Sequence, residues 1–312
     1  MKSELDFKNN FLVISYSTIF ITVIYFLLLK ASPLTFSFFC FSPLVFIALI
    51  TNLRQSLISF ITSITLIVLL INFQETTGDF VNSFFLTNII FVFGFSYLLL
   101  TVLNIGKENS KNFGANLSFY VFITSIIFIS LFIIYLSGPM SLLISEIKVD
   151  YIKSTNPDNQ LLTMQLNKLF DGVVKIFPSI NFIFHFLIIL TNLFVIRKLL
   201  EKTNFVLMTK IQFNSFSIPN WYLIFYFLIF FFNILFYEQF KHFFLNIIIS
   251  LSSIFFLSGF YIFKDFIRRI NQPLFLKILI LFLLFIFLGY VLILSLFFLG
   301  LIDKLKRIFI RD

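Results

Sequence analysis

The chain has 312 residues, of which 60% are hydrophobic and only 12% are charged, and its formal net charge is +9. Soluble domains are about 45–50% apolar and about 25% charged, so this chain has too few polar residues to cover a water-exposed surface. The composition excludes a soluble enzyme, a disordered tail and a nucleic-acid-binding module. It predicts that the lipid bilayer is the main partner of the chain.

Nine apolar segments follow one another along the chain. Their residue ranges are 11–29, 34–53, 56–73, 80–102, 117–136, 180–196, 221–237, 243–263 and 274–301. Each is close to the roughly 20 residues that a helix needs to cross a bilayer core of about 30 Å. Because their apolar residues are continuous rather than alternating, helices are favoured over membrane strands. We therefore predict an all-α, polytopic transmembrane helix bundle with eight or nine spans, forming a single integral membrane domain over residues 1–312.

Small polar residues and a proline distinguish the first two segments. Ser15, Thr18 and Thr22 lie on one face of the first segment, where small side chains allow another helix to come close. That helix belongs either to the same chain or to a second subunit. In the second segment, Pro43 lacks a backbone N–H and predicts a kinked helix, with a re-entrant element as the alternative.

The connection formed by residues 137–179 is long and contains one amphipathic stretch. Apolar residues recur in it at helical spacing, at Leu162, Leu166, Leu169 and Val173. We predict an amphipathic helix over residues 161–177. This helix either lies in the membrane interface or simply connects two spans.

Basic residues are unevenly divided between the two alternating sets of loops. The set that includes the N-terminus carries Lys2, Lys8, Arg54, Lys107, Lys111, Arg197, Lys198, Lys202, Lys210, Lys264, Arg268, Arg269 and Lys277. The short loops of the other set carry only Lys30 and Lys241, so the positive-inside rule predicts a cytoplasmic N-terminus. Nine spans would place the C-terminal tail outside although it is basic, with Lys304, Lys306, Arg307 and Arg311. Either the tail is external or one segment does not cross.

The sequence contains no catalytic or nucleotide-binding motif that we recognise. Gly106-Lys107 is followed by Glu108, where a phosphate-binding loop needs Ser or Thr. The acidic residues lie in loops or at segment ends, whereas an ion-driven carrier keeps an ionisable group near the membrane midplane. With a single cysteine, Cys40, and two histidines, neither a disulfide nor a zinc site is expected. We therefore expect no enzyme activity, no cofactor and no metal.

Three consecutive segments carry polar side chains at helical spacing on one face, which we call the polar faces. They are Asn181, His185 and Asn192; Tyr222, Tyr226 and Asn233; and Asn246, Ser250 and Ser253. Polar groups in hydrocarbon are costly unless they have partners, so these faces are expected to turn inward and meet. They form either hydrogen bonds between helices, a pocket for a neutral or weakly polar small molecule, or a proton relay through His185.

The last third of the chain carries short motifs of a known family. They are Pro219-Asn220-Trp221, Asn246, Gly259, Arg268-Arg269, Pro273, Gly300-Leu301-Ile302-Asp303 and a basic tail that ends at Arg311. Over about residues 190–312 the chain resembles the YybS-like family of bacterial multi-spanning membrane proteins, a domain of unknown function. The resemblance implies a multi-pass protein of the bacterial cytoplasmic (inner) membrane, with a fold related to the substrate-binding membrane subunits of energy-coupling-factor transporters. Those subunits bind vitamins or metal ions and obtain ATP hydrolysis from partner subunits.

Two functions agree with the sequence. The first is a transport-like or small-ligand-binding membrane subunit, which uses the polar faces as its pocket and works with other membrane subunits or an external ATPase. The alternative is a non-catalytic membrane scaffold or assembly protein, in which the polar faces only hold the helices together. Neither function involves nucleic acid.

Overall fold

The computed structural model describes residues 2–31, 39–72, 94, 96, 98, 113–137, 148–150, 160–203, 216–236, 238–269 and 273–310. These residues form helices and short connections, and no strand occurs among them, which confirms the predicted all-α class for this part of the chain. The chain divides into two compact units. One comprises Met1–Lys111 and Phe184–Gln212, and the other comprises Asn112–Ile183 and Phe213–Asp312. That the whole chain forms one domain stays a prediction.

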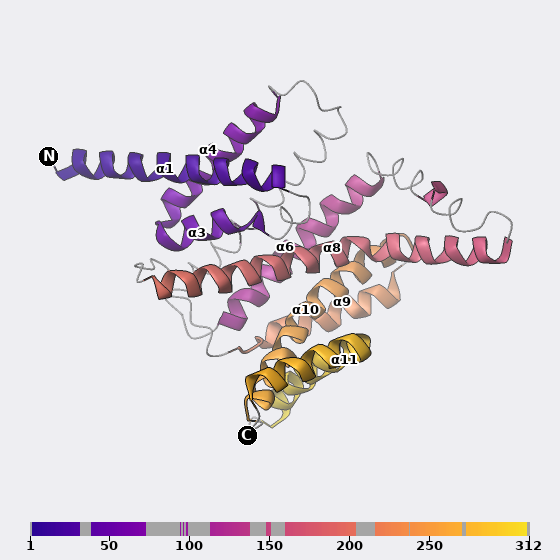
Figure 1. Ribbon diagram of the computed structural model, residues 1–312. Helices are drawn as coiled ribbons and strands as arrows, with labels where there is room; N and C mark the ends of the chain where they lie inside the picture. Colours follow the sequence, from indigo (N-terminus) through magenta and orange to yellow (C-terminus); the bar gives the residue numbers. More distant parts are fainter. Residues whose placement is uncertain are drawn as a thin grey trace. The chain divides into compact units, whose positions relative to one another are not determined.

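The first unit begins with α1 (Lys2–Ala31), which packs against α4 (Leu53–Asn72) (Figure 1). The Thr18 and Thr62 hydroxyl oxygens lie 2.7 Å apart in a hydrogen bond between these helices, and Gln55 donates to Asn10 at 2.6 Å. Thr22 instead donates to the Thr18 carbonyl of its own helix, at 2.8 Å. The small polar face of the first segment therefore serves, at Thr18, for packing within this chain.

The second predicted span is not one continuous helix. Instead, α3 (Ser42–Ile50) has nine residues and is about 14 Å long, about half of a bilayer core. Pro43 lies in its first turn, where the missing N–H breaks no helical hydrogen bond, so the proline begins the helix and does not kink it. The helix ends at Thr51, which is extended. The prediction of a kinked span over residues 34–53 was wrong for the described part of that segment.

The second unit is built around α10 (Glu238–Arg269), which packs against α6 (Phe113–Ser137), α9 (Asn220–Leu235) and α11 (Leu274–Phe309) (Figure 1). Two glycines allow α10 and α11 to touch backbone to backbone. A Cβ atom on Gly259 would lie 1.8 Å from the Leu296 carbonyl oxygen, and one on Gly300 would lie 1.9 Å from the Phe255 carbonyl oxygen. No other residue fits at either position without moving a helix.

A third glycine fixes the segment that leads into α9. A Cβ atom on Gly114 would lie 2.5 Å from the Ser217 carbonyl oxygen, so the chain crosses α6 here at close range. The next side chains hold the segment in place, because Phe216 stacks on Tyr261 of α10 at 5.0 Å and Ile218 is buried. These contacts determine where α9 begins.

A single helix, α8 (Gln160–Lys202), runs through both the predicted amphipathic helix and the sixth predicted span. It has 43 residues and contains Pro178, which lies between the two predicted segments, residues 161–177 and 180–196. At 1.5 Å per residue it is about 65 Å long, about twice the thickness of a bilayer core. That its first half lies in the membrane interface stays a prediction.

Within the described residues, five helices have stretches that are long and apolar enough to cross a membrane. These stretches are Asn10–Leu27, Leu53–Leu70, Phe113–Ile134, Met164–Lys202 and Phe240–Arg269. The seventh predicted span corresponds to α9, a shorter apolar helix of 16 residues, and the ninth lies within α11. The predicted span over residues 80–102 falls outside the described residues except at 94, 96 and 98. The total of eight or nine spans therefore stays a prediction.

Candidate functional site

Asn246 on α10 bridges an interruption in the backbone hydrogen bonding of α8. Its side-chain nitrogen donates to the Lys175 carbonyl at 2.8 Å, and its side-chain oxygen accepts from the Ser179 N–H at 3.0 Å. In an uninterrupted helix that N–H would bond to that same carbonyl four residues earlier. The ring of Pro178 opens this turn, and the Asn246 amide takes the place of the lost bond.

We call the contact between Asn246 and the opened turn at Pro178 the clasp. The Asn246 side chain is almost fully buried, at 1% exposed, and its nitrogen also donates to the His242 carbonyl at 2.7 Å. Lipid offers no partners for backbone groups, so an opened helix in a membrane protein needs such a partner from a neighbouring helix. The hydrogen bonds of Asn246 therefore go to backbone groups.

The two tyrosines of the second polar face connect α9 to α10. Tyr222 donates its hydroxyl to the Leu251 carbonyl at 2.8 Å, and the Tyr226 hydroxyl lies 3.1 Å from that of Ser252. The Ser253 hydroxyl donates to the Ser250 carbonyl of its own helix at 2.7 Å. The described parts of these faces thus form hydrogen bonds within and between helices.

The first polar face is divided between the two units. Asn192 accepts a hydrogen bond from Ser42 at the start of α3 and donates to the Ile188 carbonyl of its own helix at 2.9 Å. The His185 ring meets the Phe41 ring edge-on, with centroids 6.1 Å apart. Asn181 is partly exposed. The proton relay through His185 stays a prediction.

Two polar atoms of these faces are buried without a hydrogen-bond partner among the described residues. They are the side-chain oxygens of Asn233 and Ser250. The predicted pocket for a small neutral ligand on the polar faces stays a prediction. None of its nine residues lines the cleft described next.

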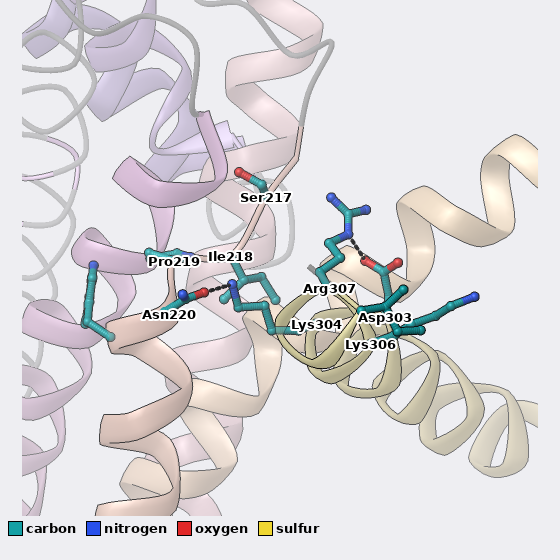
Figure 2. Close-up of a pocket in the computed structure, with 10 residues that line it drawn as sticks. Ser217, Ile218, Pro219, Asn220, Asp303, Lys304, Lys306 and Arg307 are labelled. Atoms are coloured by element: carbon teal, nitrogen blue, oxygen red, sulfur yellow. Dashed lines mark hydrogen bonds and ion pairs between the residues drawn. The ribbon is translucent and has the colours of Figure 1, made fainter. Parts of the chain in front are cut away.

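A cleft of about 880 Å³ lies where the start of α9 meets the end of α11 (Figure 2). One side is formed by the segment that leads into α9 and by its first turn, and the other by the last turns of α11. The lining residues are Ser217, Ile218, Pro219, Asn220, Trp221, Asp303, Lys304, Lys306, Arg307 and Ile310. The close contacts at Gly114, Gly259 and Gly300 hold these two sides in position.

Positive charge dominates the lining of this cleft. Lys304 is only 8% exposed, and its ammonium donates to the Asn220 side-chain oxygen at 2.6 Å. Arg307 pairs with Asp303, with Nε and Oδ2 2.9 Å apart, and Lys306 is exposed. Among the described residues, three cations and one carboxylate therefore line the opening, and a concave surface with an excess of one charge attracts ions of the opposite sign. We call this cleft the basic cleft.

Sequence reasoning noticed the residues of the basic cleft but did not bring them together. In the sequence, Lys304, Lys306 and Arg307 belong to a basic tail that bears on membrane topology and on the family resemblance, and Pro219-Asn220-Trp221 is another motif of that resemblance. The sequence feature that could have indicated the cleft is that the basic tail and the Pro219-Asn220-Trp221 motif both lie at ends of apolar segments. Within the described ranges, no cluster of three or more His, Cys, Asp or Glu side chains could hold a metal ion.

The fold defines the class of this protein. It is a membrane protein whose described residues form helices, several of them long and apolar.

A family model described as "Predicted membrane protein (DUF2232)" matches residues 19–304, and the chain therefore belongs to the DUF2232 family. The match includes α4, α6, α9 and α10 and most of the lining of the basic cleft. No curated protein and no solved structure matches the chain. The resemblance to the YybS-like family, and the relation to transporter subunits that it implies, stay predictions.

Proposed function

We propose that this protein is a ligand-binding membrane subunit whose ligand is an anion held in the basic cleft. The observation that carries the proposal is an opening of about 880 Å³ whose described lining residues include three cations and one carboxylate. Anions with oxygen acceptors, such as phosphates and carboxylates, form short charge-assisted hydrogen bonds with Lys and Arg. The proposal moves the binding site from the polar faces to the basic cleft and replaces a neutral ligand with a charged one.

The burial of Lys304 separates this cleft from an ordinary basic loop. The positive-inside rule accounts for exposed residues such as Lys306 and Arg307 at the end of a span. It gives no reason for a lysine that is 8% exposed and bonded to Asn220 at 2.6 Å. A cation held in place before the ligand arrives lowers the cost of ordering the site on binding, which favours a built binding site.

Thermal unfolding in a neutral detergent tests this proposal. Phosphate, sulfate and citrate are compared with chloride at constant ionic strength, and bound anion raises the unfolding temperature of the native protein. The double variant Lys306→Gln/Arg307→Gln should lose most of this rise. Both side chains are exposed, so the folded state should keep its stability.

The matched control is Lys198→Gln/Arg268→Gln, which removes one lysine and one arginine that are exposed and lie outside the cleft. This variant should respond to the anions as the wild type does. If the cleft variant and the control respond equally, the anions act on the whole surface and the proposal is wrong.

A role in transport is a further part of the proposal. The chain lacks a phosphate-binding loop, so active transport would need an external ATPase or other membrane subunits as partners. We propose binding without a covalent step in the chain itself. The complex purified from its own membrane should then hydrolyse ATP faster when phosphate occupies the cleft, and Lys306→Gln/Arg307→Gln should remove that increase.

The hydrogen bonds of the polar faces favour a second candidate function, a non-catalytic scaffold or assembly protein. Tyr222 and Asn246 bind backbone groups of other segments, which is what side chains with a purely structural role do. A scaffold would keep its partners when the basic cleft is neutralised. If the protein is a scaffold, Lys306→Gln/Arg307→Gln should leave the purified assembly intact, even though the variant no longer responds to anions.

A further inference from the structure

We infer that the basic cleft binds the phosphate group of an anionic phospholipid. The inference rests on the proposed function, because it names the source of the anion that the cleft holds. Two observations support it in addition to the charge of the cleft. They are the position of the cleft along its helices and the apolar helix face that leads away from it.

The position of the cleft corresponds to the depth of lipid headgroups. Trp221 lies in the first turn of α9, and Lys304 and Lys306 follow directly on the apolar part of α11. Tryptophan and basic residues at the ends of apolar helices mark the boundary between membrane and water. Lipid phosphates lie at that same boundary, and basic pockets between membrane helices are known to bind anionic headgroups.

An apolar face of α11 ends at the cleft. Phe298 and Ile302 are 52% and 58% exposed, and together with Lys306 they follow one another at intervals of four residues, which places them on one side of the helix. An acyl chain along Phe298 and Ile302 would bring its phosphate next to Lys306. A free phosphate ion gains nothing from contact with an apolar surface, so the combination of basic cleft and apolar face favours a lipid.

Arg307 keeps two donor groups that do not point at its carboxylate partner. Its Nε atom is taken by Asp303 at 2.9 Å, and Figure 2 shows the two terminal nitrogens of the guanidinium pointing away from that carboxylate. Arginine often binds phosphate through two parallel hydrogen bonds, which the terminal nitrogens can form. The pairing with Asp303 along the helix holds the guanidinium in place for this contact.

The only tryptophan of the chain reports directly on this site, because Trp221 lines the cleft. The protein is placed in lipid nanodiscs made of neutral phosphatidylcholine with a small fraction of brominated lipid, which quenches tryptophan fluorescence at contact. In one series the brominated lipid is phosphatidylglycerol, and in the other it is phosphatidylcholine. We expect stronger quenching by phosphatidylglycerol, since each basic residue near an anionic lipid contributes roughly a fivefold preference at low salt.

The variants decide whether the preference belongs to the cleft. In Lys306→Gln/Arg307→Gln the two brominated lipids should quench almost equally, while Lys198→Gln/Arg268→Gln should keep the wild-type preference. Raising the salt concentration should weaken the preference of the wild type, because exposed charges are screened. If the preference for phosphatidylglycerol survives in the cleft variant, the lipid is bound elsewhere and the inference is wrong.

A second arm, with soluble phosphate, separates this inference from the proposed function. Inorganic phosphate and glycerol phosphate are added to the protein in neutral detergent, and Trp221 fluorescence and the unfolding temperature are followed. If both respond through Lys306 and Arg307 but the nanodiscs show no preference for phosphatidylglycerol, the proposed anion site stands and the lipid inference fails. If neither experiment depends on these two residues, both fail.

Discussion

The clasp and the basic cleft each contain a buried polar side chain of the same unit, and they differ in what that side chain binds. At the clasp, Asn246 binds the backbone of α8 and closes a gap in a helix. At the cleft, Lys304 binds the side chain of Asn220 and brings a positive charge to the edge of an open volume. In a membrane protein, a buried amide that bonds to backbone belongs to the architecture. A buried charge beside an opening is the better candidate for function.

The largest expected effect comes from the glycine contact on which the cleft depends. Gly300→Ala puts a methyl group 1.9 Å from the Phe255 carbonyl oxygen, so α10 and α11 must move apart. We expect a loss of about 3 kcal/mol in the free energy of unfolding, measured by denaturant titration in mixed micelles. Gly300→Ala should also abolish the response of the protein to phosphate, since the end of α11 is displaced.

Gly172→Ala in α8 is the matched control. A Cβ atom there meets nothing within 4 Å, so the protein should keep its stability or gain about 0.5–1 kcal/mol from the better helix propensity of alanine. Equal losses for the two variants would show that the backbone contact between α10 and α11 is not required.

The clasp gives the next effect. Asn246→Leu leaves the Ser179 N–H and the Lys175 carbonyl without their partner in an apolar environment, and we expect a loss of about 2 kcal/mol in the free energy of unfolding. Binding of phosphate to the basic cleft should be unchanged. Ser130→Ala is the control, because that hydroxyl bonds to the Ile126 carbonyl of its own helix and its removal should cost far less.

A double variant tests the cause of the clasp. Pro178→Ala restores the N–H that proline lacks and allows the turn to close, so Asn246 is no longer needed there. The cost of Asn246→Leu should therefore be smaller by about 1 kcal/mol in the Pro178→Ala background, measured as a double-mutant cycle. If the two substitutions are additive, Asn246 does not replace the bond that the proline removes.

The helices that the sequence predicted correctly are those that the lipid environment alone requires. Long apolar segments have to be helical in a bilayer, and α4, α6 and α10 lie where the hydrophobic segments lie. The prediction for Pro43 was wrong and none was made for Pro178, because the effect of a proline depends on more distant structure. Pro43 begins a short helix, whereas Pro178 stands inside a long one, because Asn246 of α10 satisfies the opened turn.

The cleft was beyond sequence reasoning for a related reason. Lys304 is buried near two close approaches between distant segments, where Gly300 lets α11 approach α10 and Gly114 lets the Ser217 segment cross α6. A hydrophobicity pattern locates the end of a helix but does not tell which other helix end it meets. Local sequence patterns thus predicted the helices, whereas the site depends on close contacts that glycines allow between segments far apart in the sequence.

Lys304→Met should have the opposite effects to Asn246→Leu, with little change in stability and a loss of phosphate binding. Replacing a buried charge by an apolar side chain of similar length is close to neutral for stability, and Asn220 is exposed enough to bond to water instead. We expect a change within about 1 kcal/mol in the free energy of unfolding and a loss of about fivefold in phosphate affinity, followed by Trp221 fluorescence. A large loss of stability with unchanged affinity would assign Lys304 to the architecture and weaken the contrast between the two regions.

The smallest effect is expected at the contact between α9 and α10. Tyr226→Phe removes a hydrogen bond of 3.1 Å to the Ser252 hydroxyl, which can turn to other partners, so the loss should be about 0.6 kcal/mol, the average for such bonds between membrane helices. Tyr222→Phe removes a donor from the Leu251 carbonyl in a fully buried place and should cost about 1 kcal/mol. The ranking depends on whether the remaining partner stays satisfied. If Tyr226→Phe costs as much as Asn246→Leu, hydrogen bonds between side chains stabilise this bundle as strongly as the bonds that complete a broken helix, and the special status of the clasp is lost.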